Sequence, residues 1–106
     1  MDLSMLELQV MSACMSLHPT AYGVSIQEHI ERRVGYEPSS GSIYAALERL
    51  QQKGYVKSRQ GEPTAERGGR RKLYFVVTAP GEHALRHSLD AIGSLNSDLR
   101  WNEAKA

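Results

Sequence analysis

The sequence predicts an α+β, mainly helical fold: a winged helix-turn-helix followed by a C-terminal dimerisation helix. Two observations lead to this fold class. Residues 39–53 combine one apolar helical stripe with an opposite face of small and polar side chains. The basic stretch 53–72 follows at once and has the turn residues and alternation of a β-hairpin. A helix that fits a DNA groove, beside a hairpin that contacts phosphates, is typical of winged helices.

Length and composition set the domain organisation. A chain of 106 residues with a net charge of +1 is predicted to form a single core. We expect a winged-helix domain at residues 1–77, a dimerisation helix at 78–100 and a disordered tail at 101–106. No apolar run is long enough to span a bilayer, and the N-terminus lacks the basic region of a signal peptide. The lone Cys14 suits a reducing compartment, so we expect a cytoplasmic protein with a buried thiol.

Residues 3–17 are predicted to form the first helix. Its apolar side chains extend nearly all round the helix and include Leu3, Leu6, Val10, Met11 and Met15. Such a helix must be covered on more than one side. Because the chain is short, self-association is the simplest cover for the second side.

A second helix follows the break at His18 and Pro19. Tyr22, Ile26 and Ile30 are spaced by four residues, and the helix is expected to end near Gly35. Residues 35–38 then connect it to the third helix.

The third helix is the candidate recognition helix. Ile43, Leu47 and Leu50 form its apolar stripe, serines after Pro38 cap its start, and Gly54 ends it. The opposite face is small and polar and suits the major groove of DNA. We expect DNA contacts from Ser39, Ser40, Ser42, Tyr44, Ala45 and Arg49.

The predicted wing consists of strands at residues 55–60 and 70–77, joined by a long turn at 61–69. Residues 53–72 contain seven basic and two acidic side chains, a net charge of +5. The positive charge of the chain is therefore concentrated here. We expect phosphate contacts from Arg67, Arg70, Arg71 and Lys72.

The last helix is predicted to begin after Thr78, a good N-cap, with Pro80 in its first turn. A second apolar stripe runs along it. We expect the dimer interface to comprise Leu6, Val10, Leu85, Leu89, Ile92 and Leu99.

Four motifs together resemble the PadR family of bacterial transcriptional regulators. They are residues 41–56 (GSIYAALERLQQKGYV), Tyr22-Gly23, residues 68–74 (GGRRKLY) and residues 78–81 (TAPG). Ala45 stands where proline is frequent in the family, and residues 75–77 (FVV) replace a commoner polar-then-leucine ending. The single C-terminal helix is similar to the smaller subfamily. The resemblance implies a homodimeric repressor that binds double-stranded DNA at a palindromic operator. It also implies a possible small aromatic effector near Trp101.

Other functions were weighed against this one. The sequence has no catalytic triad spacing, phosphate-binding loop or Cys/His cluster, so we expect neither an enzyme nor a cofactor. His83, His87 and Asp90 share one helix face and form the one candidate metal site, but solvated side chains are the more common explanation and no metal is expected. The remaining alternative is a winged helix that contacts another protein instead of DNA.

Overall fold

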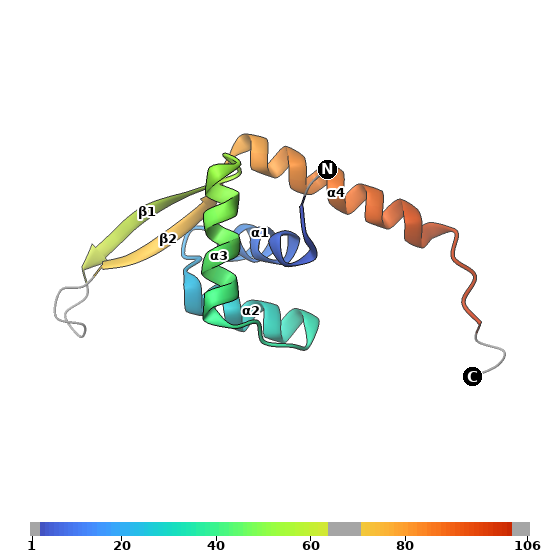
Figure 1. Ribbon diagram of the computed structural model, residues 1–106, viewed down its shortest axis with the longest axis horizontal. Coiled ribbons are helices and arrows are strands. Elements are labelled where there is room, and N and C mark those ends of the chain that lie inside the picture. Colours follow the sequence, from blue (N-terminus) through green and yellow to red (C-terminus); the bar gives the residue numbers. More distant parts are fainter. Residues whose placement is uncertain (1–2, 64–70, 103–106) are drawn as a thin grey trace.

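The computed structural model describes residues 3–63 and 71–102. Its elements are, in order, α1 (Met5–Leu17), α2 (Gly23–Val34), α3 (Ser40–Gln52), β1 (Val56–Pro63), β2 (Arg71–Val77) and α4 (Ala79–Ser97). The first three helices pack together, the β1–β2 hairpin extends from one side of them, and α4 extends from the other (Figure 1). This arrangement confirms the predicted winged helix-turn-helix with its additional C-terminal helix.

The hydrophobic core lies between the three helices and the base of the hairpin. Ile43, Leu47 and Leu50 of α3 are at its centre and are fully buried. Ala46 of α3 is also in the core, and the rest of the chain supplies the remaining core side chains: Leu8, Val10, Met11, Ala13, Cys14, Ala21, Ile26, Ile30, Val56, Phe75 and Leu85. Burial raises the pKa of the Cys14 thiol to about 12. The thiol is therefore protonated at neutral pH and has little nucleophilic character.

Both ends of α3 lie where the sequence places them. The Ser39 hydroxyl accepts a hydrogen bond from the Ser42 N–H at 3.1 Å and caps the first turn. At the other end Gly54 has φ +79°, a conformation that favours glycine. This turn lets the Tyr55 N–H donate to the Leu50 carbonyl at 2.9 Å, which closes the last turn of the helix.

The hairpin is an antiparallel pair whose register runs from Val56 opposite Val77 to Gln60 opposite Leu73. The Phe75 N–H donates to the Ala21 carbonyl at 2.9 Å, so the loop between α1 and α2 is hydrogen-bonded to β2. β1 runs to Pro63 and so is longer than predicted, with an irregularity in the register between Gln60 and Pro63. Residues 61–63 of the predicted turn are therefore strand, and residues 64–69 of it lie outside the described residues.

The beginning of α4 is fixed to the turn that follows α3. The Thr78 hydroxyl accepts from the Gly81 N–H at 3.1 Å and donates to the Gly54 carbonyl at 2.7 Å. Ala84 and Leu85 are buried, whereas all the residues from 89 to 102 are exposed. The helix ends at Ser97, so the predicted end at residue 100 is too late and Leu99 lies beyond the helix.

Two glycines of α4 test how this helix is attached. A Cβ at Gly81 would overlap the main-chain carbonyl of Tyr55, whereas a Cβ at Gly93 would meet open space. We expect Gly81→Ala to lower the free energy of unfolding by about 2 kcal/mol, because the backbone contact cannot relax. Gly93→Ala should raise it by up to about 1 kcal/mol through helix propensity. Urea unfolding at one protein concentration measures both, and equal effects would contradict the close contact at Gly81.

Candidate nucleic-acid interface

The solvent-facing side of α3 is the first part of the candidate interface. The predicted contact residues Ser39, Ser40, Ser42, Tyr44, Ala45 and Arg49 are all exposed, opposite the buried stripe. Residues 39–47 contain no charged side chain. Glu48 is also exposed on α3 and was not predicted as a contact residue. The first two turns of α3 therefore offer an uncharged surface whose side chains are small except for Tyr44.

Hydrogen bonds at the start of α3 orient its serines. The Ser39 hydroxyl accepts from the Ser42 N–H and donates to the Ser42 hydroxyl oxygen at 2.9 Å. Because the Ser42 oxygen accepts this bond, its own hydrogen can be donated elsewhere. Ser39 is thus engaged within the helix, and Ser42 has a donor to offer to a DNA base.

Tyr44 connects α3 to the start of α2. A Cβ at Gly23 would overlap the Tyr44 hydroxyl, so the absence of a side chain at Gly23 makes room for the ring. Half of Tyr44 is still exposed. The Tyr22-Gly23 pair of the sequence therefore has a packing role beside the predicted recognition surface.

The wing holds two of its cations over aromatic rings. The Lys72 Nζ lies 4.2 Å from the centre of the Tyr22 ring, and the guanidinium carbon of Arg59 lies 4.9 Å from that of Tyr74. The two tyrosine rings meet edge to face at 6.1 Å. The Arg59 Nη2 also donates to the Pro19 carbonyl at 2.8 Å. Cation–π contacts of this kind leave the charges at the surface while limiting their motion.

The other predicted wing contacts are less fully described. Arg67 and Arg70 lie outside the described residues, and Arg71 begins β2. Arg59 was not predicted as a contact residue, although it belongs to the same basic stretch. Its pairing with Tyr74, from the other strand of the hairpin, is not visible in the order of residues.

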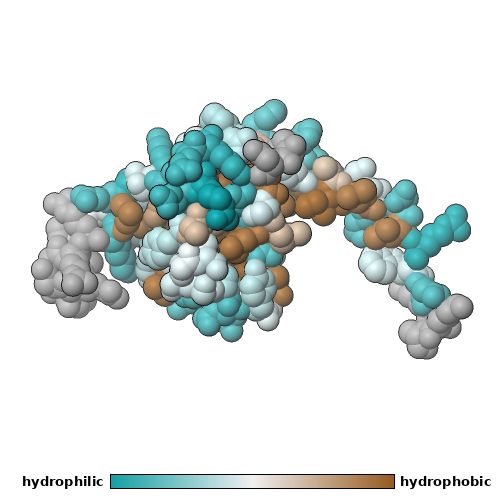
Figure 2. Space-filling model, in the orientation of Figure 1, coloured by the Kyte–Doolittle hydropathy of each residue, from teal (hydrophilic) through white to brown (hydrophobic). Residues whose placement is uncertain are grey.

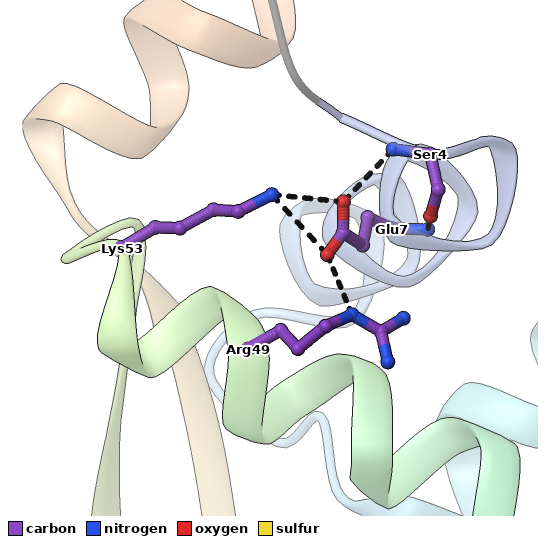
Figure 3. A network of polar contacts seen from close by, with 4 residues as sticks. All are labelled: Ser4, Glu7, Arg49 and Lys53. Carbon is purple, nitrogen blue, oxygen red and sulfur yellow. Dashed lines mark hydrogen bonds and ion pairs between the residues drawn. The ribbon is translucent and has the colours of Figure 1, made fainter.

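A buried carboxylate joins α1 to α3, the candidate recognition helix. Glu7 Oε2 accepts from the Arg49 Nε at 3.0 Å, and Oε1 accepts from the Lys53 Nζ at 3.1 Å (Figure 3). The Ser4 N–H donates to Oε1 at 2.8 Å, while the Ser4 hydroxyl accepts from the Glu7 N–H. The side chain of Glu7 is 3% exposed, against 49% for Arg49 and 26% for Lys53. Arg49 was predicted as a DNA contact, but its pairing with Glu7 was not predicted.

These donors determine the ionisation of Glu7. Burial by itself raises the pKa of the carboxyl, but the hydrogen bonds from Ser4, Arg49 and Lys53 and the charge of Lys53 outweigh it. The pKa therefore lies below its ordinary value of 4.5. Glu7 is a carboxylate at neutral pH, and both cations are held against it.

The profile described as the transcriptional regulator PadR-like family matches residues 14–87, from the end of α1 into α4. The chain belongs to this family. The resemblance found in the sequence motifs is thereby confirmed. The members of this family are transcriptional regulators. The expectation that the chain is not an enzyme is thereby confirmed.

Solved PadR-like structures share the fold. A PadR family regulator from Clostridium difficile is 20% identical, with 88% of this chain and 92% of that chain covered and a TM-score of 0.74. A PadR-like regulator from Bacillus cereus is 20% identical, with coverage of 87% and 84% and a TM-score of 0.73. PadR of Bacillus subtilis, solved in complex with operator DNA, is 17% identical and has a TM-score of 0.67. The match covers 81% of this chain and 48% of that chain. No curated protein matches the chain.

The residues predicted for a PadR-like dimer interface fall into two groups. Val10 and Leu85 belong to the core of the single chain, and Val10 is 0% exposed, so it offers no surface to a partner. Leu6 is partly buried against that core. Leu89, Ile92 and Leu99 are exposed. Figure 2 shows apolar side chains along α4 where it leaves the helical body.

A cavity of about 380 Å³ lies where α4 passes the body of this PadR-like chain. It is lined by residues of three helices: Met5, Leu8, Gln9, Ser12, Ser16, His29, Ile30, Arg33, Val34, Leu89 and Ile92. Most of the lining surface is apolar. On α1 the lining combines the apolar Met5 and Leu8 with the polar Gln9, Ser12 and Ser16, and the hollow continues onto α4 at Leu89 and Ile92.

Other predicted sites remain outside this interface. Trp101, the candidate ligand residue, is 70% exposed and lies beyond the end of α4. Among residues 3–63 and 71–102, no three His, Cys, Asp or Glu side chains are grouped so that they could hold a metal ion. Within the same part of the chain, no helix is both long and apolar enough to cross a membrane.

The depressed pKa of Glu7 predicts a pH dependence of stability. A carboxyl whose pKa is lower in the folded state contributes its full stabilisation above its unfolded pKa and loses it as the pH falls through the folded one. Below about pH 4.5 the wild type should therefore lose more free energy of unfolding than Glu7→Gln, which cannot titrate. Urea unfolding across a pH series measures both proteins, and parallel curves would contradict the prediction.

Proposed function

We propose that the protein is a homodimeric transcriptional repressor that binds double-stranded DNA sequence-specifically at a palindromic operator. In this proposal α3 enters the major groove and the wing contacts phosphates. The single observation that carries it is the small, uncharged start of α3 beside a wing whose cations lie at the surface. The proposed place of action is the cytoplasm.

The exposed face of α3 suits close approach to base edges. An α-helix just fits the major groove, so bulky or charged side chains on its leading turns would keep the backbone away from the bases. Ser42 can donate a hydrogen bond to a base, and Ala45 can contact a thymine methyl group. Arg49, two turns further on, can donate to guanine or to a phosphate.

The wing supplies cations where phosphates would lie. Lys57, Arg59 and Lys72 are described residues of the hairpin, and Arg59 and Lys72 are held by the two tyrosine rings. Phosphate contacts position a protein on DNA without distinguishing sequences. Bacillus subtilis PadR, which shares the fold, was solved in complex with operator DNA, and this supports DNA as the partner of the present chain.

A palindromic operator requires two recognition helices in one particle. Successive major-groove half-sites on one side of the duplex are about 34 Å apart, and one α3 can occupy one of them. The exposed apolar side chains of α4 and the hollow beside α1 are the proposed site of dimerisation. Burying them against a second copy removes apolar surface from water. An aromatic effector at Trp101 stays a prediction of the family resemblance.

DNA binding is tested first by selecting bound duplexes from a random-sequence pool. Ser42→Ala should lose on the order of 1 kcal/mol on the selected duplex and little on a scrambled one, because a base contact is removed. Lys72→Gln should weaken both duplexes and flatten the log–log salt dependence by about two per dimer, because each protomer loses one phosphate contact.

Titrations over a range of salt concentrations measure both variants. If the pool yields no preferred sequence, the proposal is wrong and the winged helix serves protein contact instead. If the two variants lose affinity in equal proportion on every duplex, α3 does not recognise bases.

Dimerisation is tested on α4. Leu89→Asp should give monomers, because a carboxylate in an apolar interface is costly to bury. Leu73→Asp on the wing is the matched control, since Leu73 and Leu89 are similarly exposed in the single chain, at 45% and 47%. Analytical ultracentrifugation measures both. A Leu89→Asp variant that remains dimeric would place the interface elsewhere.

A further inference from the structure

Among the described residues, Glu7 is the one charged side chain that is buried. Removing a carboxylate from water is costly unless its oxygens are fully hydrogen-bonded. Here both oxygens are bonded, and two of the donors are Arg49 in α3 and its C-cap residue Lys53, 42 and 46 residues further along the chain. The carboxylate therefore acts on the two cations nearest the C-terminal end of the recognition helix.

We propose that Glu7 is a positioning residue for DNA recognition: it fixes the guanidinium of Arg49 for contact with the operator and restrains the ammonium of Lys53 from phosphates. The inference rests on the proposed function. It assigns to α1, which has no residue in the predicted DNA surface, a part in operator preference.

The geometry at Arg49 supports the positioning role. Glu7 engages only the Nε, at 3.0 Å, and the two Nη atoms point away from the carboxylate (Figure 3). The side chain is half exposed, so these donors are accessible. Ser42 and Arg49 are seven residues apart on α3, which places them on the same side of the helix. A guanidinium held in one orientation before DNA arrives loses less conformational entropy when it binds.

Glu7 restrains the ammonium group of Lys53 and does not orient it toward DNA. Its Nζ lies 3.1 Å from one oxygen of Glu7 and 3.3 Å from the other, and three quarters of its side chain is covered. The carboxylate of Glu7 also reduces the net charge at this place from the +2 of Arg49 and Lys53 to +1. Because non-specific affinity for DNA comes almost entirely from phosphate contacts, this arrangement weakens binding to random sequence.

A purely structural role for Glu7, joining α1 to α3, makes a different prediction. Loss of that role would lower stability and reduce the amount of active protein, but the folded fraction would bind every sequence as before. The positioning role instead changes the ratio of operator to random affinity and the salt dependence. These two quantities therefore distinguish the roles.

The test is Glu7→Gln, which keeps the size of the side chain and removes its charge. Binding is measured near neutral pH on the duplex that the wild type selects from the random pool and on a scrambled duplex. We expect affinity for the selected duplex to fall about tenfold, as for the loss of one good base contact. Affinity for the scrambled duplex should rise about threefold, with a salt slope steeper by about two per dimer, because the positive charge that Glu7 neutralises in each protomer becomes available to phosphates.

The matched control is Glu82→Gln. Glu82 also pairs with an arginine at 3.0 Å, but its partner is Arg86 in α4 and the pair is exposed. The substitution removes the same charge from the chain without touching α3. Its operator-to-random ratio and salt slope should equal those of the wild type. Equal changes in both variants would mean that net charge alone is responsible, and would overturn the proposal.

A second variant keeps the test independent of the stability of Glu7→Gln. Arg49→Lys retains the positive charge but loses the planar group that Glu7 orients. It should reproduce the loss of operator preference, and the double variant should be no worse on the selected duplex than either single variant. Additive losses, or a folded Glu7→Gln with the wild-type ratio and slope, would overturn the proposal.

A wild type without any sequence preference would instead show in its own titrations that the proposed function is wrong, and the inference would fall with it.

Discussion

The burial of one face of α3 is the constraint on which the rest of the structure depends. Ile43, Leu47 and Leu50 are fully buried there, and each contributes roughly 1.5–3 kcal/mol relative to an exposed position. This contact fixes the rotation of α3 about its axis and therefore which residues face solvent. The turn at Gly54 then sets the direction in which β1 leaves the helix. One apolar contact thus determines the geometry of both the helix surface and the wing beside it.

Much of the fold could be predicted because its determinants are local. The start of α3 at Ser39, its end at Gly54 and the start of α4 at Thr78 each depend on residues within one turn of the boundary. The spacing of apolar residues likewise identified the buried stripe of α3. The end of α4 was less predictable, because the apolar pattern runs on to Leu99 after the helix has ended at Ser97.

Contacts between distant segments account for what the sequence did not reveal. Val10 was assigned to the dimer because a helix that is apolar all round does not indicate which side faces its own core. Lys72 was identified as a wing cation, but its place over Tyr22 brings together residues from different elements. No function was predicted for Glu7 from the sequence. Its role follows from how α1 packs against α3, which no pattern along the chain encodes.

The attachment of Arg49 to Glu7 has a consequence for how such a regulator can evolve. Ala45 and Glu48 face solvent and contribute no core side chain, so a lineage can exchange them singly with little loss of stability. Arg49 differs from them, because its replacement deprives a buried carboxylate of a donor. A change there is tolerated when α1 changes as well. Under the proposed function, new target preferences are therefore accessible through single mutations at some positions of α3, and through paired mutations on two helices at another.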